Sequence, residues 1–248
     1  MDSDVPLNEQ EKGAFSPMVE ESRKVDFVIA GAMKSGTSAL DTYLREHTEI
    51  CMATPKEVHF FDDEKLFREA RVDYDHYHSF FKPTEQHRRM GESTQIYMYW
   101  QDCPKRLWQY NPDMKIIIVL RNPIDRAHSM RNMQVVRGLE TLSFWDALQK
   151  ESERGRENLP FQSRRYSYMD RGFYVEQLRR VWKFFPPDQT LILKSENLKR
   201  EPTATLNRIA SFLGVSGLEE VRKKGSQCQS VFSDEREGKG LSSECIRV

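Results

Sequence analysis

The chain has 248 residues, and its 38 lysines and arginines balance 38 aspartates and glutamates, so the formal net charge is zero. This balance excludes a globally basic nucleic-acid-binding protein and an acidic, disordered one. Hydrophobic residues make up 38% of the chain and aromatic residues 11%, enough for a globular domain that folds without disulfides. The four cysteines are scattered and form no CxxC pair, which favours reduced thiols and no zinc site.

The two ends of the chain differ in composition from its middle. Residues 1–24 lack apolar periodicity and contain no apolar stretch of a secretory signal, so we expect a disordered or loosely attached leader. Residues 25–248 are predicted to form one domain, of which residues 226–248 are a polar tail. No apolar run approaches the ~18 residues of a membrane span. We therefore expect a cytoplasmic protein without a membrane partner, and the sequence leaves its oligomeric state open.

Short apolar runs alternate with helical patterns along the domain. The run 25–30 predicts a buried strand, which a glycine turn at 31–36 connects to a helix over 37–44. The later predicted elements are an extended segment at 56–62, helices at 74–81, 96–108, 123–137, 143–156, 174–185 and 203–213, and strands at 115–120 and 190–193. The strand KIIIVL at 115–120 shows no alternation, which is typical of a central parallel strand. The order predicts an α/β fold with a central parallel sheet flanked by helices.

The first glycine turn has the composition of a phosphate site. Residues 31–38 read GAMKSGTS, between a predicted strand and a predicted helix. Backbone N–H groups of such a turn bind anions, and Lys34, Thr37 and Ser38 add a charge and two hydroxyl groups. Because Lys34 precedes Gly36, the turn is not a Walker A loop, in which the lysine follows the last glycine. An ordinary glycine turn with a solvated lysine is the alternative.

A second candidate anion site follows the predicted central strand. Residues 121–129 read RNPIDRAHS, and ligands of open α/β sheets bind outside the carboxyl ends of the strands. Arg121, together with Ser129 further along the following helix, could bind a second phosphate through charged and hydroxyl donors. A strand-end arginine that forms a salt bridge is the alternative.

The segment KEVHFF at 56–61 is a candidate for proton transfer. In an extended segment Glu57 and His59 point to one face, where a carboxylate or an imidazole could remove a proton. Burial beside Phe60 and Phe61 is expected to raise the pKa of Glu57 toward neutrality. A buried ion pair, with His59 satisfied in the core, is the alternative.

These segments together resemble the sulfotransferases that use 3′-phosphoadenosine 5′-phosphosulfate (PAPS). The most similar branch is the one that contains the heparan sulfate sulfotransferases and small bacterial relatives. The resemblance covers about residues 25–215 and rests on the order and spacing of GAMKSGTSAL, KEVHFFD, IIIVLRNPIDRAHSM and RGFYVEQLRRVWKFFPPDQTLILKSENLKREPTATLNRIASFLGV. It implies a P-loop-like three-layer fold and PAPS as the sulfuryl donor, with no metal.

The resemblance also implies roles for individual residues. Lys34 matches the lysine that stabilises charge on the leaving phosphate, within the 5′-phosphosulfate loop formed by Lys34, Ser35, Gly36, Thr37 and Ser38. Arg121 and Ser129 match the pair that holds the 3′-phosphate. Glu57 matches the general base of the heparan-type branch, with His59 beside it as the substitute.

Two further positions match the family less closely, and one departs from it. Tyr174 matches a position near the adenosine. Lys239, within Gly238-Lys239-Gly240, loosely resembles a late loop that closes over the nucleotide. The heparan-type enzymes often carry a lysine where this chain has Ser93, so one charge that could steady the transferring sulfuryl group is missing.

The sequence therefore predicts in-line sulfuryl transfer from PAPS to a hydroxyl, with an amine as the second choice. The absence of a basic excess favours a small-molecule or carbohydrate acceptor over a long polyanion. Two alternatives stay open: an ATP-dependent P-loop-like small-molecule kinase, and a nucleotide-binding module without catalysis.

Overall fold

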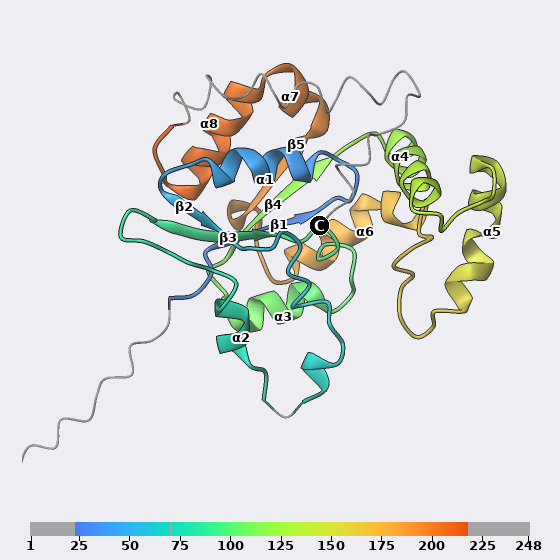
Figure 1. Cartoon of the computed structure of the whole chain (residues 1–248), viewed down its shortest axis with the longest axis horizontal. Coiled ribbons are helices and arrows are strands. Elements are labelled where there is room, and N and C mark those ends of the chain that lie inside the picture. The colour runs from blue at the N-terminus through green and yellow to red at the C-terminus, as the bar shows by residue number, and fades with distance from the viewer. Residues whose placement is uncertain (1–22, 70, 218–248) are drawn as a thin grey trace, which may run out of the picture.

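The computed structural model describes residues 23–69 and 71–217. Its centre is a five-stranded parallel sheet with strand order β2-β3-β1-β4-β5 (Figure 1). The strands are β1 (Phe27–Gly31), β2 (Ile50–Met52), β3 (Arg89–Ser93), β4 (Lys115–Leu120) and β5 (Thr190–Lys194). The α-helices are α1 (Thr37–Arg45), α2 (Tyr74–His78), α3 (Cys103–Tyr110), α4 (Pro123–Val136), α5 (Phe144–Arg156), α6 (Tyr174–Trp182), α7 (Ser195–Arg200) and α8 (Pro202–Leu213). Short 3₁₀ helices are η1 (Leu66–Arg68), η2 (Asp170–Gly172) and η3 (Pro187–Gln189).

The sheet separates two layers of helices, because successive residues of a strand point to opposite faces. Phe27 and Ile29 of β1 pack into one buried cluster with side chains of α1, α7 and α8. Val28 and Ala30 pack into the other cluster with side chains of α3 and α6. Figure 1 shows α1, α7 and α8 on one side of the sheet and α2 and α3 on the other. The predicted three-layer α/β architecture is confirmed.

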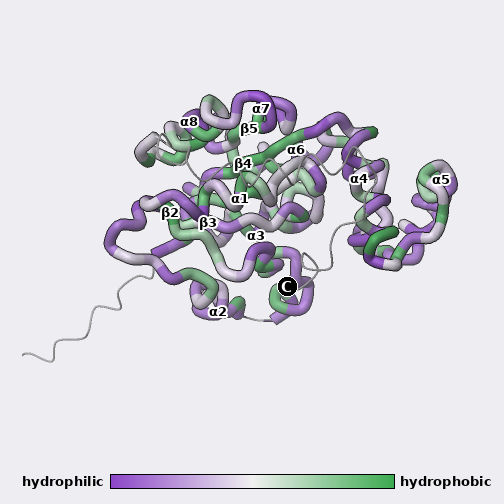
Figure 2. Tube along the Cα trace, turned by 45° about the horizontal axis from the view of Figure 1, so that its top comes forward, coloured by the Kyte–Doolittle hydropathy of each residue, from purple (hydrophilic) through white to green (hydrophobic). Residues whose placement is uncertain are grey.

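Strand β4 is the most apolar part of the sheet. Ile116, Ile117, Ile118 and Val119 are buried, as a parallel strand with helices on both faces requires. Figure 2 draws much of β4 in the green of hydrophobic residues. Strand β3 lies so close to β1 that a Cβ atom on Gly91 would come within 2.2 Å of the Phe27 ring, so glycine is needed there.

The order of the strands places a topological switch point at the carboxyl ends of the inner strands β1 and β4. After β1 the chain moves toward β2 and β3, and after β3 it crosses to β4 on the other side of β1. The loops after β1 and β4 therefore diverge at a topological switch point, where α/β folds bind ligands. The two candidate anion sites of the sequence follow these two strands.

Several predicted elements differ from the structure. The predicted helix at 96–108 starts only at Cys103, where Pro104 occupies the first turn, and residues 96–100 form a buried turn instead. The helices predicted at 74–81 and 174–185 end at His78 and Trp182. Strands β2 and β3 and helix α7 were not predicted, because they are short and β3 contains Gly91, Glu92 and Ser93.

The segment 56–62 is not an extended strand, so that prediction is wrong. Glu57 and His59 adopt left-handed backbone conformations, with φ angles of 61° and 57°. Almost all of the predicted leader and all of the polar tail lie outside the described residues. Within the described part of the chain, no helix is both long and apolar enough to cross a membrane.

Candidate active site

The loop between β1 and α1 has the shape of an anion cradle. Lys34 and Gly36 have φ angles of 68° and 98°, so the chain turns sharply before the N-terminus of α1. Ser35 is fully buried, and its hydroxyl group forms no hydrogen bond of normal geometry with the residues that the structure describes. An unsatisfied buried hydroxyl in a loop of this kind fits a ligand oxygen, because such a group is costly to leave unpaired. Thr37 is also buried and donates to Gln95 Oε1 at 3.1 Å.

Arg121 brings the second predicted anion site against this loop. It follows β4, and its Nη1 donates to the Lys34 carbonyl oxygen at 3.3 Å. The Tyr174 hydroxyl donates in turn to the Arg121 carbonyl oxygen at 2.9 Å, which places the start of α6 beside both. Ser129 lies half-buried on α4, the helix that begins two residues after Arg121.

Three polar residues share a rare backbone conformation. Among the described residues, Lys34, Glu57 and His59 are the non-glycine residues with positive φ angles, at 68°, 61° and 57°. This conformation costs ~1–2 kcal/mol per residue and is concentrated at functional sites, where surrounding contacts hold it. The same three residues were predicted to be catalytic from the sequence.

An alternating row of charges crosses the site beside the loop. Lys56 Nζ lies 2.8 Å from Glu57 Oε1, and Glu57 Oε2 lies 3.6 Å from His59 Nε2. His59 Nδ1 lies 3.1 Å from the buried carboxylate of Asp62, which also pairs with Arg164. The guanidinium of Arg164 stacks on the Trp100 ring at 4.1 Å. Each charge in the row thus has opposite charges as neighbours.

These contacts set the pKa values of the two candidate bases. Hydrogen bonds to Asp62 and Glu57 raise the pKa of His59 to about 9, although partial burial opposes this. Partial burial would raise the pKa of Glu57, but hydrogen bonds and charges from His59 and Lys56 outweigh it and lower this pKa to about 2. The expectation that burial brings the Glu57 pKa near neutrality is therefore wrong, because its cationic neighbours dominate.

Four residues of the site had no role in the sequence prediction. Gln95 donates to Glu57 Oε1 at 2.7 Å and accepts from Thr37, so it joins residues 56–62, the candidate catalytic segment, to the loop. Asp62 binds His59 Nδ1 and also pairs with Arg164, and Lys56 lies beside Glu57. Lys56 and Asp62 could have been found, because they flank the Glu57–His59 pair in the sequence. Gln95 and Arg164 lie far along the chain and carry no local signal.

A buried carboxylate lies beneath the catalytic segment. Glu92 of β3 accepts hydrogen bonds from Tyr77 at 2.7 Å, Thr94 at 2.7 Å and Tyr97 at 3.1 Å. The Tyr97 oxygen also accepts from the Phe60 amide at 3.1 Å. Complete burial raises the pKa of Glu92 to about 7, even though the three hydroxyls favour its ionised form.

Ser93, where heparan-type enzymes often carry a lysine, lies next to the candidate base Glu57. Ser93 follows Glu92 at the end of β3, and its carbonyl oxygen accepts from the Glu57 amide at 3.1 Å. The Ser93 side chain is 1% exposed, and its hydroxyl has no hydrogen-bond partner. This position therefore contributes an uncharged, unpaired hydroxyl group near the catalytic segment.

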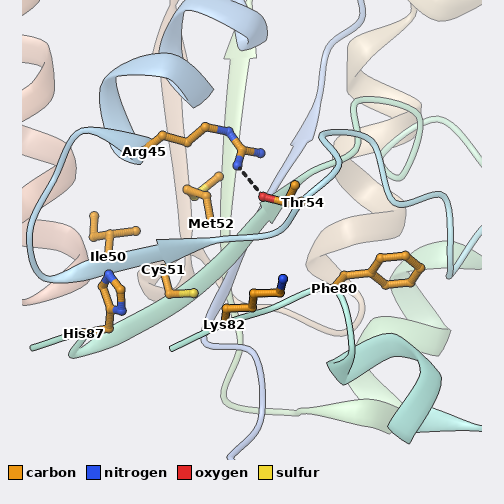
Figure 3. Close-up of a pocket in the computed structure, with 8 residues that line it drawn as sticks. All are labelled: Arg45, Ile50, Cys51, Met52, Thr54, Phe80, Lys82 and His87. Atoms are coloured by element: carbon orange, nitrogen blue, oxygen red, sulfur yellow. Dashed lines mark hydrogen bonds between the residues drawn. The ribbon is translucent and has the colours of Figure 1, made fainter. Parts of the chain in front are cut away.

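A groove of about 370 Å³ lies along edge strand β2 (Figure 3). Arg45 reaches across it to Thr54, with 3.3 Å between Nη1 and Oγ1. The lining contains the basic residues Arg45, Lys82 and His87 and no carboxylate. Thr54 precedes Lys56 by two residues, so one end of the groove lies toward the catalytic segment.

Two further predictions concern the late loop around Lys239 and the absence of a metal site. Lys239, predicted to close over the nucleotide, lies outside them. Within residues 23–69 and 71–217, no group of three or more histidines, cysteines, aspartates and glutamates could hold a metal ion.

Several known proteins are similar to this chain in sequence. The sulfotransferase domain model matches residues 24–233. Mouse heparan sulfate glucosamine 3-O-sulfotransferase 3B1 is 28% identical over 221 residues, which cover 86% of this chain and 51% of that protein. Mouse bifunctional heparan sulfate N-deacetylase/N-sulfotransferase 3 is 29% identical over 203 residues, which cover 77% of this chain and 22% of that protein. The chain spans about half the length of the first of these relatives and less of the second.

A solved bacterial structure agrees with the sequence relatives. The crystal structure of a sulfotransferase from Alicyclobacillus acidocaldarius superposes with a TM-score of 0.70 and 33% identity, covering 78% of this chain and 82% of that one. The resemblance drawn from the motifs is confirmed, and the match of the family model over most of the sequence shows that the chain belongs to the sulfotransferase domain family.

Proposed function

We propose that this protein transfers a sulfuryl group from PAPS to a hydroxyl group of a small-molecule or carbohydrate acceptor. The observation that carries the proposal is that side-chain contacts join the loop of Lys34 to the segment of Glu57 and His59, three polar residues with left-handed backbone conformations. Gln95 ties the two segments together, since it contacts both Thr37 and Glu57. An anion cradle and a charged proton-transfer segment thus lie against each other.

The residues around the cradle fit a nucleotide with two phosphate-type ends. The buried, unpaired hydroxyl of Ser35 and the N-terminus of α1 suit the 5′-phosphosulfate, with Lys34, Gly36, Thr37 and Ser38 around it. Arg121 and Ser129 suit the 3′-phosphate, and Tyr174 suits the adenosine between them. Lys34 stabilises the charge that develops on the leaving phosphate.

Bound PAPS supplies the sulfuryl group. The acceptor oxygen forms a bond to sulfur while the bond between sulfur and the 5′-phosphate oxygen breaks, and its electron pair stays on that oxygen. Glu57 takes the acceptor proton. His59 serves as a cation that orients Glu57, because an imidazole with a pKa of about 9 is protonated at neutral pH and cannot accept a proton.

The acceptor approaches from the side of the catalytic segment. The groove along β2, at about 370 Å³, has the size of a small-ligand pocket and offers basic and apolar walls. An acceptor of moderate size that reaches from Glu57 toward Thr54 fits this surface.

The proposal is tested by incubating the protein with PAPS and a panel of neutral and acidic sugars, phenols and alcohols. The masses of the products are then measured by mass spectrometry. We expect a gain of one sulfate on at least one hydroxyl compound, with release of 3′-phosphoadenosine 5′-phosphate (PAP). Phosphate transfer from ATP and magnesium, without sulfate transfer from PAPS, would overturn the proposal.

A further inference from the structure

Lys56 occupies a position between the two halves of the site. Its ammonium nitrogen lies 2.8 Å from Glu57 Oε1 and 3.2 Å from the Ser38 hydroxyl oxygen. Ser38 belongs to the first turn of α1, directly after the anion cradle. One cation thus contacts both the candidate base and the loop that faces the donor.

The salt bridge between Lys56 and Glu57 is partly exposed, so Lys56 can exchange this partner for a ligand. Its side chain is 24% exposed and that of Glu57 is 30% exposed, so both remain accessible to a ligand. Glu57 has two other partners, His59 and Gln95, which hold its carboxylate when Lys56 moves. The other carboxylate whose charge Lys56 influences is Asp41, and Asp41 already pairs with Arg45 at 2.7 Å.

Among the described residues, the end of β3 beside Glu57 carries no cationic side chain at position 93. Ser93, whose carbonyl oxygen accepts from the Glu57 amide, carries an uncharged hydroxyl. A cation that steadies negative oxygens between Glu57 and the cradle must therefore come from another segment. Lys56 is adjacent to the base in the chain and already points to the cradle.

We propose that Lys56 is a further catalytic residue that binds the sulfuryl oxygens of the donor during transfer and, in doing so, releases Glu57 to act as the base. This inference rests on the proposed function. The ammonium of Lys56 pairs with the Glu57 carboxylate and neutralises its charge. A bound sulfuryl group competes for that ammonium, so the carboxylate loses one cationic partner at the moment when the acceptor proton must be taken.

The electrostatics of Glu57 agree with this exchange. Lys56 contributes both a hydrogen bond and a charge to the lowering of the Glu57 pKa to about 2. Removal of that contribution raises the pKa of Glu57 and makes it a stronger base. His59 and Gln95 keep their contacts with Glu57, so the change is confined to the contact with Lys56.

The sharpest test compares two nucleotides that differ by the sulfuryl group. Calorimetry without acceptor measures the affinities of PAPS and PAP for the wild type, Lys56→Met and Lys56→Arg. Lys56→Met should weaken PAPS binding about tenfold or more and leave PAP binding nearly unchanged, as loss of one charge-assisted hydrogen bond predicts. Lys56→Arg keeps the charge and should restore part of the preference. The matched control Lys65→Met, at an exposed lysine of the same stretch, should change neither affinity.

Turnover provides the second readout. Lys56→Met should lose about 10²–10³-fold in kcat at saturating PAPS, comparable to removal of one donor to a developing charge. The acid limb of its pH profile should move to higher pH, because Glu57 has lost a cationic partner. Equal loss of PAPS and PAP affinity, or normal turnover, would overturn the role of Lys56 while leaving the proposed function intact. A wild type that binds neither nucleotide would instead overturn the proposed function itself.

Discussion

Backbone conformation singles out the residues of the site more sharply than burial does. Lys34 and Glu57 are half-buried and His59 is exposed, yet each adopts a left-handed conformation that ordinary residues avoid. Contacts compensate for this strain: the Glu57 carboxylate binds Lys56 and Gln95, and the Glu57 backbone N–H donates a hydrogen bond to the Ser93 carbonyl oxygen. Such a segment presents its side chains at fixed angles, which favours proton transfer in a defined direction.

The sequence identified Glu57 and His59 but not their ionisation. It could show that a carboxylate and an imidazole lie two residues apart. It could not show that Asp62, the partner of His59, also pairs with Arg164, because Arg164 lies 102 residues after Asp62 in the chain. The direction of the Glu57 pKa shift was therefore predicted wrongly, since the contacts of its carboxylate with Lys56 and His59 depend on left-handed backbone conformations that the sequence does not display.

Replacing the candidate base should separate the roles of the pair. Glu57→Gln should keep PAP affinity and lose ~10²–10⁴-fold in turnover, the usual effect of removing a general base. His59→Ala should lose less, because His59 orients the base and is already protonated at neutral pH. Turnover at saturating PAPS, with PAP affinity as the control for folding, measures both. An active Glu57→Gln beside an inactive His59→Ala would reverse the assignment.

At the scale of elements, strand β3 links the core to the catalytic segment. Glu92 binds Tyr77 of α2 and Tyr97 in the turn before α3, and Tyr97 accepts the amides of Phe60 and Phe61. The polar segment GEST was not predicted as a strand, because its glycine and acidic residue disfavour one. Pairing of β3 with both β2 and β1 overrides that preference.

Glu92 should make stability depend on pH. Burial raises its pKa from the usual 4.5 to about 7, so the folded protein holds this proton more tightly than the unfolded chain. The stabilisation is complete below about pH 4.5 and is lost as the pH rises through about 7. The unfolding free energy of the wild type minus that of Glu92→Gln should therefore fall between about pH 5 and pH 8, measured by urea unfolding.

A second carboxylate serves as the control for this measurement. Glu64 pairs with Arg106 at 2.7 Å, and although burial opposes it, this hydrogen bond lowers the Glu64 pKa. Its stabilisation is present above its usual pKa and is lost only as the pH falls. The difference in unfolding free energy between the wild type and Glu64→Gln should stay constant from about pH 5 to pH 8. A constant difference for Glu92→Gln as well would contradict the proposed ionisation of the buried network.

At the scale of the whole molecule, the sequence predicted the architecture because its signals were strong and local. The run KIIIVL predicted β4, and the glycine turn after residues 25–30 predicted both β1 and the N-terminus of α1. Strand order and the contact between Arg121 and the Lys34 carbonyl depend on long-range pairing, which the sequence does not display. The groove along β2 was not foreseen for the same reason, since its lining comes from three separate segments.

The central claim is that the candidate active site binds a nucleotide with both a 3′- and a 5′-phosphate. The measurement that tests it most directly is calorimetry of PAP, 5′-AMP and ATP with magnesium on the wild type and on Arg121→Ala. Arg179→Ala, at an exposed arginine of α6, is the matched control. The account predicts that the wild type and the control prefer PAP by at least about tenfold, and that Arg121→Ala loses most of this preference while its AMP affinity changes little. ATP with magnesium binding as tightly as PAP, or a preference that survives in Arg121→Ala, would contradict it.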